Sequence, residues 1–219
     1  QELLDLGAQS RTPILRSPLV SMHFINAATV MVETLIAPRA MIQGTLLEIH
    51  GLGVLLQGRH GVGKSEVALA LIKRGHSLVS DDVAWLRLDG SGEVIGTAPE
   101  VTRHHMEIRG VGIIHVPSLF GVASVRDAKR LDLIIELSSS AETESNIMRD
   151  GQDKAVRNVL GKEIPFLEVP IAAGRDLANV VETAAMEFRM RAMGHDAVKE
   201  LDRKLTAILT GSAKREQTG

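Results

Sequence analysis

The residues best suited to chemistry form one glycine-rich run, Gly58-Arg59-His60-Gly61-Val62-Gly63-Lys64-Ser65. This run satisfies the Walker A pattern in full. Glycines permit backbone angles that turn successive N–H groups inward, and a helix N-terminus adds positive potential. Lys64 can then reach the β- and γ-phosphates of a nucleotide, while the Ser65 hydroxyl can ligate magnesium. The run therefore predicts a site for the phosphates of a nucleotide and for Mg²⁺.

Two adjacent carboxylates, Asp81 and Asp82, follow Lys64 by 17 and 18 residues. One helix and one strand fill that gap, which returns the pair to the edge of the sheet where the phosphates are expected. There the pair suits a general base and a water-mediated magnesium ligand. The competing interpretation is a turn that closes a strand, since Asp-Asp is common in turns.

Other polar groups give weaker signals. Glu107 lies in Met106-Glu107-Ile108-Arg109-Gly110-Val111-Gly112, which could form a mobile loop closing over phosphate or an ordinary glycine-rich turn. His104 and His105 lack a third ligand at a fixed spacing, which argues against a metal site. Arg149 is an isolated cation in a polar stretch, and its surroundings alone favour a solvated charge.

The predicted elements place the glycine-rich run between a strand and a helix. The strand is 54–57, and the helix extends from Gly63 to Arg74 with Gly75 as its stop signal. Strands predominate in the centre of the chain, so the fold class is α/β with a central sheet and C-terminal helices. The other predicted strands are 45–49, 77–80, 83–88, 93–95, 113–116 and 131–137.

The two ends of the chain are predicted to be helical or irregular, in contrast to the strands of its centre. Residues 1–20 are expected to be irregular, and Ser21 can cap a helix to about Ile36. Further helices are predicted over 176–193 and from Asp196 onward. Residues 138–153 are expected to be a mobile polar segment, 169–174 a loop, and the tail after Gly211 disordered.

Composition narrows the class of protein. With 219 residues and 44% hydrophobic content, the chain can bury one sizeable core but not two full-sized domains. Cys is absent, which excludes disulfides and a Cys nucleophile and fits a cytoplasmic setting. A net charge of −2 and five aromatic residues argue against nucleic-acid binding. No apolar run approaches the roughly 20 residues of a membrane span. Because the chain begins with Gln1, we expect a fragment or a processed product.

Several passages together resemble the bacterial HPr kinase/phosphorylase family, from about Thr12 to Gly194 with interruptions. The most specific is Glu107-Ile108-Arg109-Gly110-Val111-Gly112-Ile113-Ile114. The others are Ala37-Pro38-Arg39, Gly51-Leu52-Gly53, the Walker A run, the segment Lys73 to Asp82, Ser118-Leu119-Phe120-Gly121 and Glu182-Thr183-Ala184-Ala185-Met186. The resemblance implies phosphorylation of a serine on HPr, the phosphocarrier of the sugar phosphotransferase system, by ATP or pyrophosphate. It also implies removal of that phosphate by phosphorolysis, a fold related to phosphoenolpyruvate carboxykinase, and a homohexamer.

The resemblance also implies roles for individual residues. Asp82 would take the serine proton and return it in the reverse reaction, and Lys64 would stabilise the transferring phosphoryl group. Ser65 and Glu107 would hold Mg²⁺, and Arg149 looks like the family's catalytic arginine. The passage 106–115 would serve both reactions, whereas 170–175 would serve dephosphorylation.

The chain departs from the family pattern in three places. Gln43 stands 21 residues before Lys64, where the family has a histidine, and Gln cannot be protonated. The dephosphorylation loop reads Ala172-Ala173-Gly174-Arg175 and lacks one of the family's two arginines. Only the last helix and linker of the family's N-terminal domain are present. We therefore expect residues 1–40 to be that linker, 41–195 the catalytic domain and 196–219 a helix with a tail. Our hypothesis is that kinase activity survives and phosphorolysis is weakened.

Two other functions fit the same residues. One is a P-loop kinase of similar shape that acts on another protein or on a small molecule. The other is a non-catalytic nucleotide-sensing module, suggested by Gln43 and the missing domain.

Overall fold

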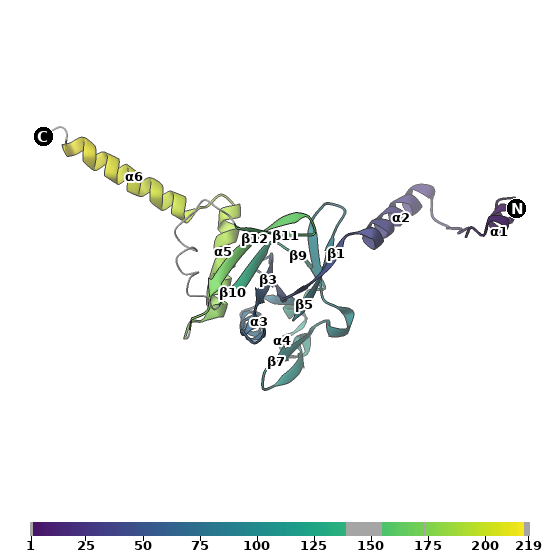
Figure 1. Cartoon of the computed structure of the whole chain (residues 1–219), viewed down its shortest axis with the longest axis horizontal. Helices are drawn as coiled ribbons and strands as arrows, with labels where there is room; N and C mark the ends of the chain where they lie inside the picture. The colour runs from purple at the N-terminus through teal and green to yellow at the C-terminus, as the bar shows by residue number, and fades with distance from the viewer. Residues whose placement is uncertain (1, 139–154, 173, 217–219) are drawn as a thin grey trace. The chain divides into compact units, whose positions relative to one another are not determined.

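The computed structural model describes residues 2–138, 155–172 and 174–216. The chain divides into two compact units, 1–37 and 38–219 (Figure 1). The predicted linker over residues 1–40, the catalytic domain over 41–195 and the separate C-terminal part from residue 196 stay predictions.

The first unit contains two helices, α1 (Glu2–Ser10) and α2 (Ser21–Ile36). The prediction that residues 1–20 are irregular was therefore wrong for α1, where Gly7 is buried against Ile14. The bounds of α2 were predicted correctly, but Ser21 does not cap it. Val20 holds the cap position without a side-chain hydrogen bond, because Ser21 is already the first helical residue.

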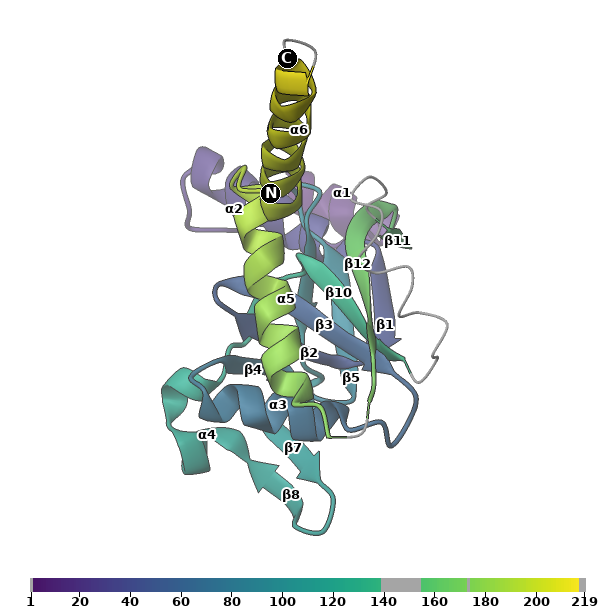
Figure 2. The same cartoon turned by 90° about the vertical axis from the view of Figure 1, so that its left-hand side faces the viewer.

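The second unit is built on a six-stranded mixed sheet in the order β11-β12-β10-β3-β2-β4 (Figure 2). Strand β10 pairs in parallel with β3 and with β12, and the remaining neighbours are antiparallel. The carboxyl ends of β3 and β10 therefore meet at one edge, which is where the Walker A run leaves the sheet. The strands are β2 (Thr45–Ile49), β3 (Leu52–Gly58), β4 (Ser77–Ser80), β10 (Leu133–Ser138), β11 (Val156–Val159) and β12 (Lys162–Pro170).

Both faces of this sheet are buried. Leu47, Leu56 and Ile135 belong to a core cluster that also contains residues of α3 (Lys64–Lys73) and α5 (Leu177–Ala192). Their neighbours along the chain, Leu46, Leu55 and Ile134, belong to a second cluster shared with the smaller sheet. Burial of alternate side chains on opposite faces explains why these strands are continuously apolar.

The smaller sheet has four strands in the order β1-β5-β6-β9, and a separate hairpin pairs β7 with β8. Their bounds are β1 (Arg39–Gln43), β5 (Val83–Leu88), β6 (Val94–Thr97), β9 (Ala128–Arg130), β7 (His105–Ile108) and β8 (Gly112–His115). Strands β1, β7, β9, β11 and β12 were not predicted. Several of them are short and carry charges, so tertiary pairing rather than an apolar pattern decides their conformation.

The remaining helices are η1 (Glu100–Thr102), α4 (Val116–Phe120), η2 (Val122–Ser124) and α6 (Ala197–Glu216). Asp176 caps α5 through the N–H of Asn179, as predicted for the start of that helix. The expected disorder after Gly211 was wrong, because α6 continues to Glu216. The predicted loop over 169–174 was also wrong at its start, since β12 continues to Pro170. In the part of the chain that is described, no helix is both long and apolar enough to cross a bilayer.

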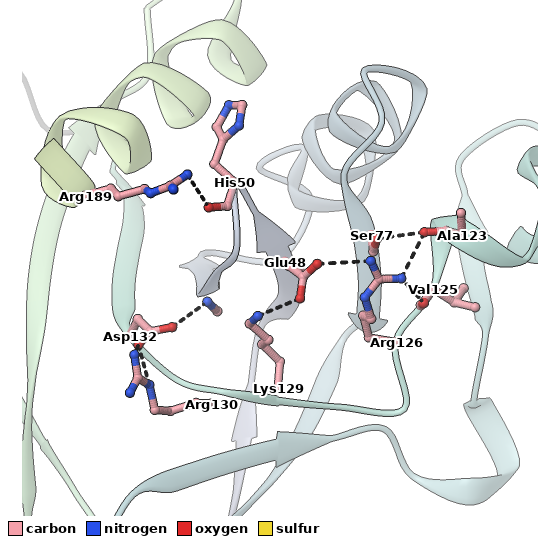
Figure 3. A network of polar contacts seen from close by, with 11 residues as sticks. Glu48, His50, Ser77, Ala123, Val125, Arg126, Lys129, Arg130, Asp132 and Arg189 are labelled. Carbon is pink, nitrogen blue, oxygen red and sulfur yellow. Dashed lines mark hydrogen bonds and ion pairs between the residues drawn. The ribbon is translucent and has the colours of Figure 1, made fainter.

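An ionic network joins the two sheets (Figure 3). Glu48 in β2 lies 2.6 Å from Lys129 Nζ in β9 and 3.1 Å from Arg126 Nη2. Burial raises the pKa of Glu48, but Lys129 and Arg126 outweigh it and leave the pKa below its ordinary value. Arg126 also donates to the carbonyl oxygens of Ala123 and Val125. The segment before β9 is thereby fastened to the central sheet.

Candidate active site

The Walker A run has the context that the sequence predicts. Strand β3 ends at Gly58 and α3 begins at Lys64. Gly58 has a φ of +142°, and a Cβ there would lie 2.7 Å from the carbonyl oxygen of Leu137 on the neighbouring strand. Gly61 and Gly63 also have positive φ. A side chain at position 58 would clash with β10, so glycine allows the loop to leave the sheet at this point.

Lys64 and Ser65 lie at the start of α3, where the N-terminal dipole favours an anion. Lys64 Nζ donates to the carbonyl oxygens of Gly58 and Arg59, at 3.2 Å each. Ser65 Oγ lies 3.3 Å from both carboxylate oxygens of Asp81. Lys64 therefore points into the loop and Ser65 faces Asp81, while their roles toward phosphate and magnesium stay predictions.

Asp81 is the buried member of the carboxylate pair. It is 8% exposed and accepts a hydrogen bond from Thr45 Oγ1 at 2.8 Å, with the Glu107 N–H 3.4 Å away. Burial raises the pKa of Asp81, and the neighbouring Asp82 adds to that increase. A cation bound beside Asp81 would offset the cost of burying its charge. The hydroxyl of Ser65 and the carboxylates of Asp81 and Glu107 are hard oxygen ligands, so the residues present fit Mg²⁺.

Asp82 is exposed and sits at a strained turn. Its φ is +59°, which is uncommon for a residue with a side chain. The N–H of Val83 donates to the carbonyl oxygen of Asp81 at 2.7 Å, and the N–H of Gly44 donates to that of Asp82 at 2.8 Å. These two bonds hold the turn, and such strain is found most often at functional sites. The turn separates the roles of the two carboxylates, one buried and one open.

Asp82, Lys64, Ser65 and Glu107 line a single cavity of about 290 Å³. Arg109 lines it too, from the turn of the β7–β8 hairpin, and a Cβ on Gly61 would lie 3.2 Å from Arg109 Nη2. The passage from Met106 to Gly112 is thus a hairpin whose turn faces the Walker A run. The other lining residues are His60, Gly61, Gly63, Glu66, Ile108, Gly110 and Gly112.

Gln43 ends β1 and pairs with Val83, the residue after Asp82. Its carbonyl oxygen accepts from Gln57 Nε2 at 3.1 Å, and Gln57 Oε1 accepts from Arg157 Nη1 at 2.6 Å. Arg157 also contacts Glu136 at 2.8 Å and lies over the ring of Phe166. Gln43, at the position where the resemblance implies a histidine, therefore lies next to the Asp82 turn and contacts Gln57, whose side chain accepts a hydrogen bond from Arg157.

Thr45 and Arg157 were not predicted from the sequence. Thr45 carried a faint signal as a buried polar residue that begins an apolar strand, whereas Arg157 belongs to no motif. Arg149 falls in the range 139–154, outside the described residues, so its role stays a prediction. The same holds for the 170–175 passage as a dephosphorylation loop, because residue 173 is also outside them.

Comparisons with known proteins agree with this geometry. Residues 34–205 match the family described as HPr Serine kinase C-terminal domain. A protein named HPr kinase/phosphorylase from Leptospira biflexa is 42% identical over 211 residues, which are 96% of this chain and 66% of the relative. The protein of that name from Bacillus subtilis is 39% identical over 216 residues, 99% of this chain and 69% of the relative.

Among solved structures, the Hpr(Ser) kinase/phosphatase from Coxiella burnetii superposes with a TM-score of 0.65 at 35% identity. The match covers 74% of this chain and 98% of that one. The present chain spans about two thirds of the length of the curated relatives. These matches, together with the Walker A run and the Glu107–Ile114 passage that lie inside them, show that the chain belongs to the HPr serine kinase C-terminal domain family.

Proposed function

We propose that this chain is the catalytic part of a bifunctional HPr kinase/phosphorylase. The observation that carries the proposal is the shared cavity of Lys64, Ser65, Asp82 and Glu107. It combines a phosphate cradle, magnesium ligands and an open carboxylate. The names of the relatives supply the acceptor, the phosphocarrier HPr, and the reverse reaction.

In the forward reaction, the serine oxygen of HPr attacks the γ-phosphorus of ATP in line, and the bond from that phosphorus to the β-phosphate oxygen breaks. Asp82 accepts the serine proton. Lys64 and Arg149 neutralise charge on the transferring phosphoryl group. With pyrophosphate as donor, inorganic phosphate leaves instead of ADP.

Magnesium would be held by Ser65 and Glu107, with Asp81 reaching it through a water molecule. It would neutralise charge on the donor phosphates. The contact of Ser65 with both oxygens of Asp81 supports this arrangement, because it keeps the hydroxyl and the buried carboxylate on one side of the cradle.

In the reverse reaction, an oxygen of inorganic phosphate attacks the phosphorus of phosphoserine, and the bond to the serine oxygen breaks. Asp82, protonated, returns its proton to that oxygen, and pyrophosphate forms. Gln43 carries no titratable proton, and one arginine of the dephosphorylation loop is missing, so we expect phosphorolysis to be the weaker activity.

Three finer features belong to the same proposal. The P-loop core is related in fold to phosphoenolpyruvate carboxykinase, the enzyme assembles as a homohexamer, and it acts in the cytoplasm. The absence of Cys is compatible with the last of these.

The test is mass spectrometry of purified HPr after incubation with the protein, Mg²⁺ and either ATP or pyrophosphate. We expect one added phosphate on a serine, and its removal when inorganic phosphate is supplied. HPr with that serine replaced by alanine is the control. Nucleotide binding without transfer to HPr would favour the sensing module. Transfer to an acceptor in an extract that lacks HPr would favour a kinase of different specificity.

A further inference from the structure

Two histidines and a glutamate converge on one point at the end of the sheet away from the Walker A run. His50 lies in the turn between β2 and β3, His76 directly precedes β4, and Glu182 is on α5. His76 Nε2 is 2.9 Å from Glu182 Oε1, and His50 Nε2 is 3.5 Å from the same oxygen. The two imidazole rings are 4.7 Å apart and nearly perpendicular.

We propose that His50, His76 and Glu182 form a binding site for a borderline-soft divalent transition ion, of which Zn²⁺ is the representative. Nothing in the phosphoryl-transfer mechanism uses these three side chains. Their ligand atoms all lie within 4.8 Å of one another. Tetrahedral ligands at zinc distances are separated by about 3.3 Å, so small side-chain rotations would bring the three atoms onto one ion.

The surroundings of Glu182 prepare it to be a ligand. Arg74 Nη1 donates to Glu182 Oε2 at 2.7 Å, and Arg74 Nη2 is 2.7 Å from Asp176. The arginine thus occupies the outer oxygen and leaves Oε1 facing the imidazoles. The contacts of Glu182 with Arg74 and His76 hold its carboxylate in place on α5. A metal-bound carboxylate with its other oxygen hydrogen-bonded is the usual arrangement in metal sites.

His50 is presented by a strained turn. Its φ is +49°, and its carbonyl oxygen accepts from Arg189 Nη1 at 2.9 Å, so α5 also fixes the backbone of this residue (Figure 3). Its side chain is 34% exposed and that of Glu182 19%, whereas His76 is 7% exposed. An ion can therefore enter from the His50 side, and two imidazole nitrogens with one carboxylate favour zinc over magnesium.

The chain offers a matched control in His104. This histidine also has a positive φ, +63°, and its Nε2 lies 3.1 Å from a carboxylate oxygen of Asp127. The ring of His115 is 6.5 Å from it, farther than in the His50–His76 pair. Asparagine tolerates positive φ, so His50→Asn and His104→Asn remove equivalent side chains without new backbone strain.

The experiment is calorimetric titration of the whole chain with Zn²⁺ in excess Mg²⁺, after chelator treatment, with Co²⁺ absorption as a second probe. We expect one Zn²⁺ per chain at this site, an affinity at least about 100-fold lower in His50→Asn, and no such loss in His104→Asn. Thermal unfolding should shift up by about 5 to 10 °C at a hundredfold excess over Kd. Absence of Zn²⁺ binding in the wild type, or equal binding in His50→Asn, would overturn the proposal.

Discussion

The two ends of the central sheet shift the pKa values of their carboxylates in opposite directions. Where β3 and β4 end, Asp81 is buried, its pKa is raised by that burial, and Asp82 is exposed at a strained turn. Where the same strands begin, Glu182 is paired with Arg74 and His76, and its pKa is lowered. At the first end, burial leaves the Asp81 carboxylate with few compensating groups, whereas at the second end Arg74 and His76 pair with the Glu182 carboxylate. The comparison therefore contrasts a carboxylate whose charge a bound cation would compensate with one that the protein already pairs.

Helix α3 connects the two ends of the sheet, so one variant at each end of this helix tests the comparison. Lys64→Ala should lower the rate of phosphoryl transfer to HPr by about 100- to 1,000-fold, because one preorganised donor to the transferring group is lost. Lys73→Ala, at the exposed C-terminal end of the same helix, should leave the rate unchanged. Steady-state kinetics of both variants measures the difference. Equal rates in the two would contradict the assignment of the phosphate site.

Arg109 tests whether the β7–β8 hairpin takes part in the catalytic end. Arg109→Ala should weaken binding of ATP with Mg²⁺ by about 10- to 100-fold, the effect of one charge-assisted hydrogen bond. Calorimetry measures that affinity. Arg103→Ala, an exposed arginine just before β7, is the control and should bind as the wild type does. Unchanged affinity in Arg109→Ala would mean that the hairpin turn does not contact phosphate.

Gln43 tests the balance between the two proposed reactions. Gln43→His should raise the rate of HPr dephosphorylation by about tenfold or more and change the kinase rate less, because it restores a titratable group beside Asp82. Release of pyrophosphate in the presence of inorganic phosphate is the measurement. Comparable dephosphorylation rates in the two proteins would count against the hypothesis that this glutamine weakens phosphorolysis.

The smallest expected effect is on stability and comes from Glu48, which pairs with Lys129 and Arg126 at the end of the sheet where β3 begins. Glu48→Gln should reduce the free energy of unfolding by about 1 to 2 kcal/mol at pH 7, since Lys129 and Arg126 lose their ionised partner. Because the folded pKa lies below the ordinary value of 4.5, this stability is present above that pH and is lost as pH falls through the folded pKa. Urea unfolding of both proteins from pH 7 downward should therefore give free energies of unfolding that converge at low pH. Exposed Glu100→Gln should show no difference at any pH.

Much of the fold could be predicted from the sequence where burial on both faces makes strands apolar. The bounds of β2 and β4 were predicted correctly for this reason. The bounds of β5 were also predicted correctly, although it buries Ala84 and Leu86 on one face and exposes Trp85 on the other. Strands β1 and β9 were missed, because Arg39–Gln43 and Ala128–Arg130 are strands only through their pairing in the smaller sheet. Local pattern cannot reveal a conformation that a distant partner imposes.

The candidate site, like the fold, could be predicted only where local sequence pattern decides it. The Walker A run and the carboxylate pair follow from residue types and spacing, and the structure brings Lys64, Ser65, Asp82 and Glu107 to one cavity. Spacing alone could not distinguish the two carboxylates, because that depends on the positive φ of Asp82 and on Thr45 holding Asp81. The cluster of His50, His76 and Glu182 could not be predicted for a similar reason, because its members come from three separate segments that only tertiary packing brings together.

The role of Asp82 as the base is tested by Asp82→Asn, when transfer to HPr and binding of ATP with Mg²⁺ are measured on the same sample. We expect transfer to fall by about 100- to 10,000-fold while the affinity for the nucleotide stays near that of the wild type. Asp127→Asn, an exposed aspartate outside the cavity, should change neither. Loss of nucleotide binding with measurable turnover, or turnover equal to that of the wild type, would contradict the role of Asp82 as the base.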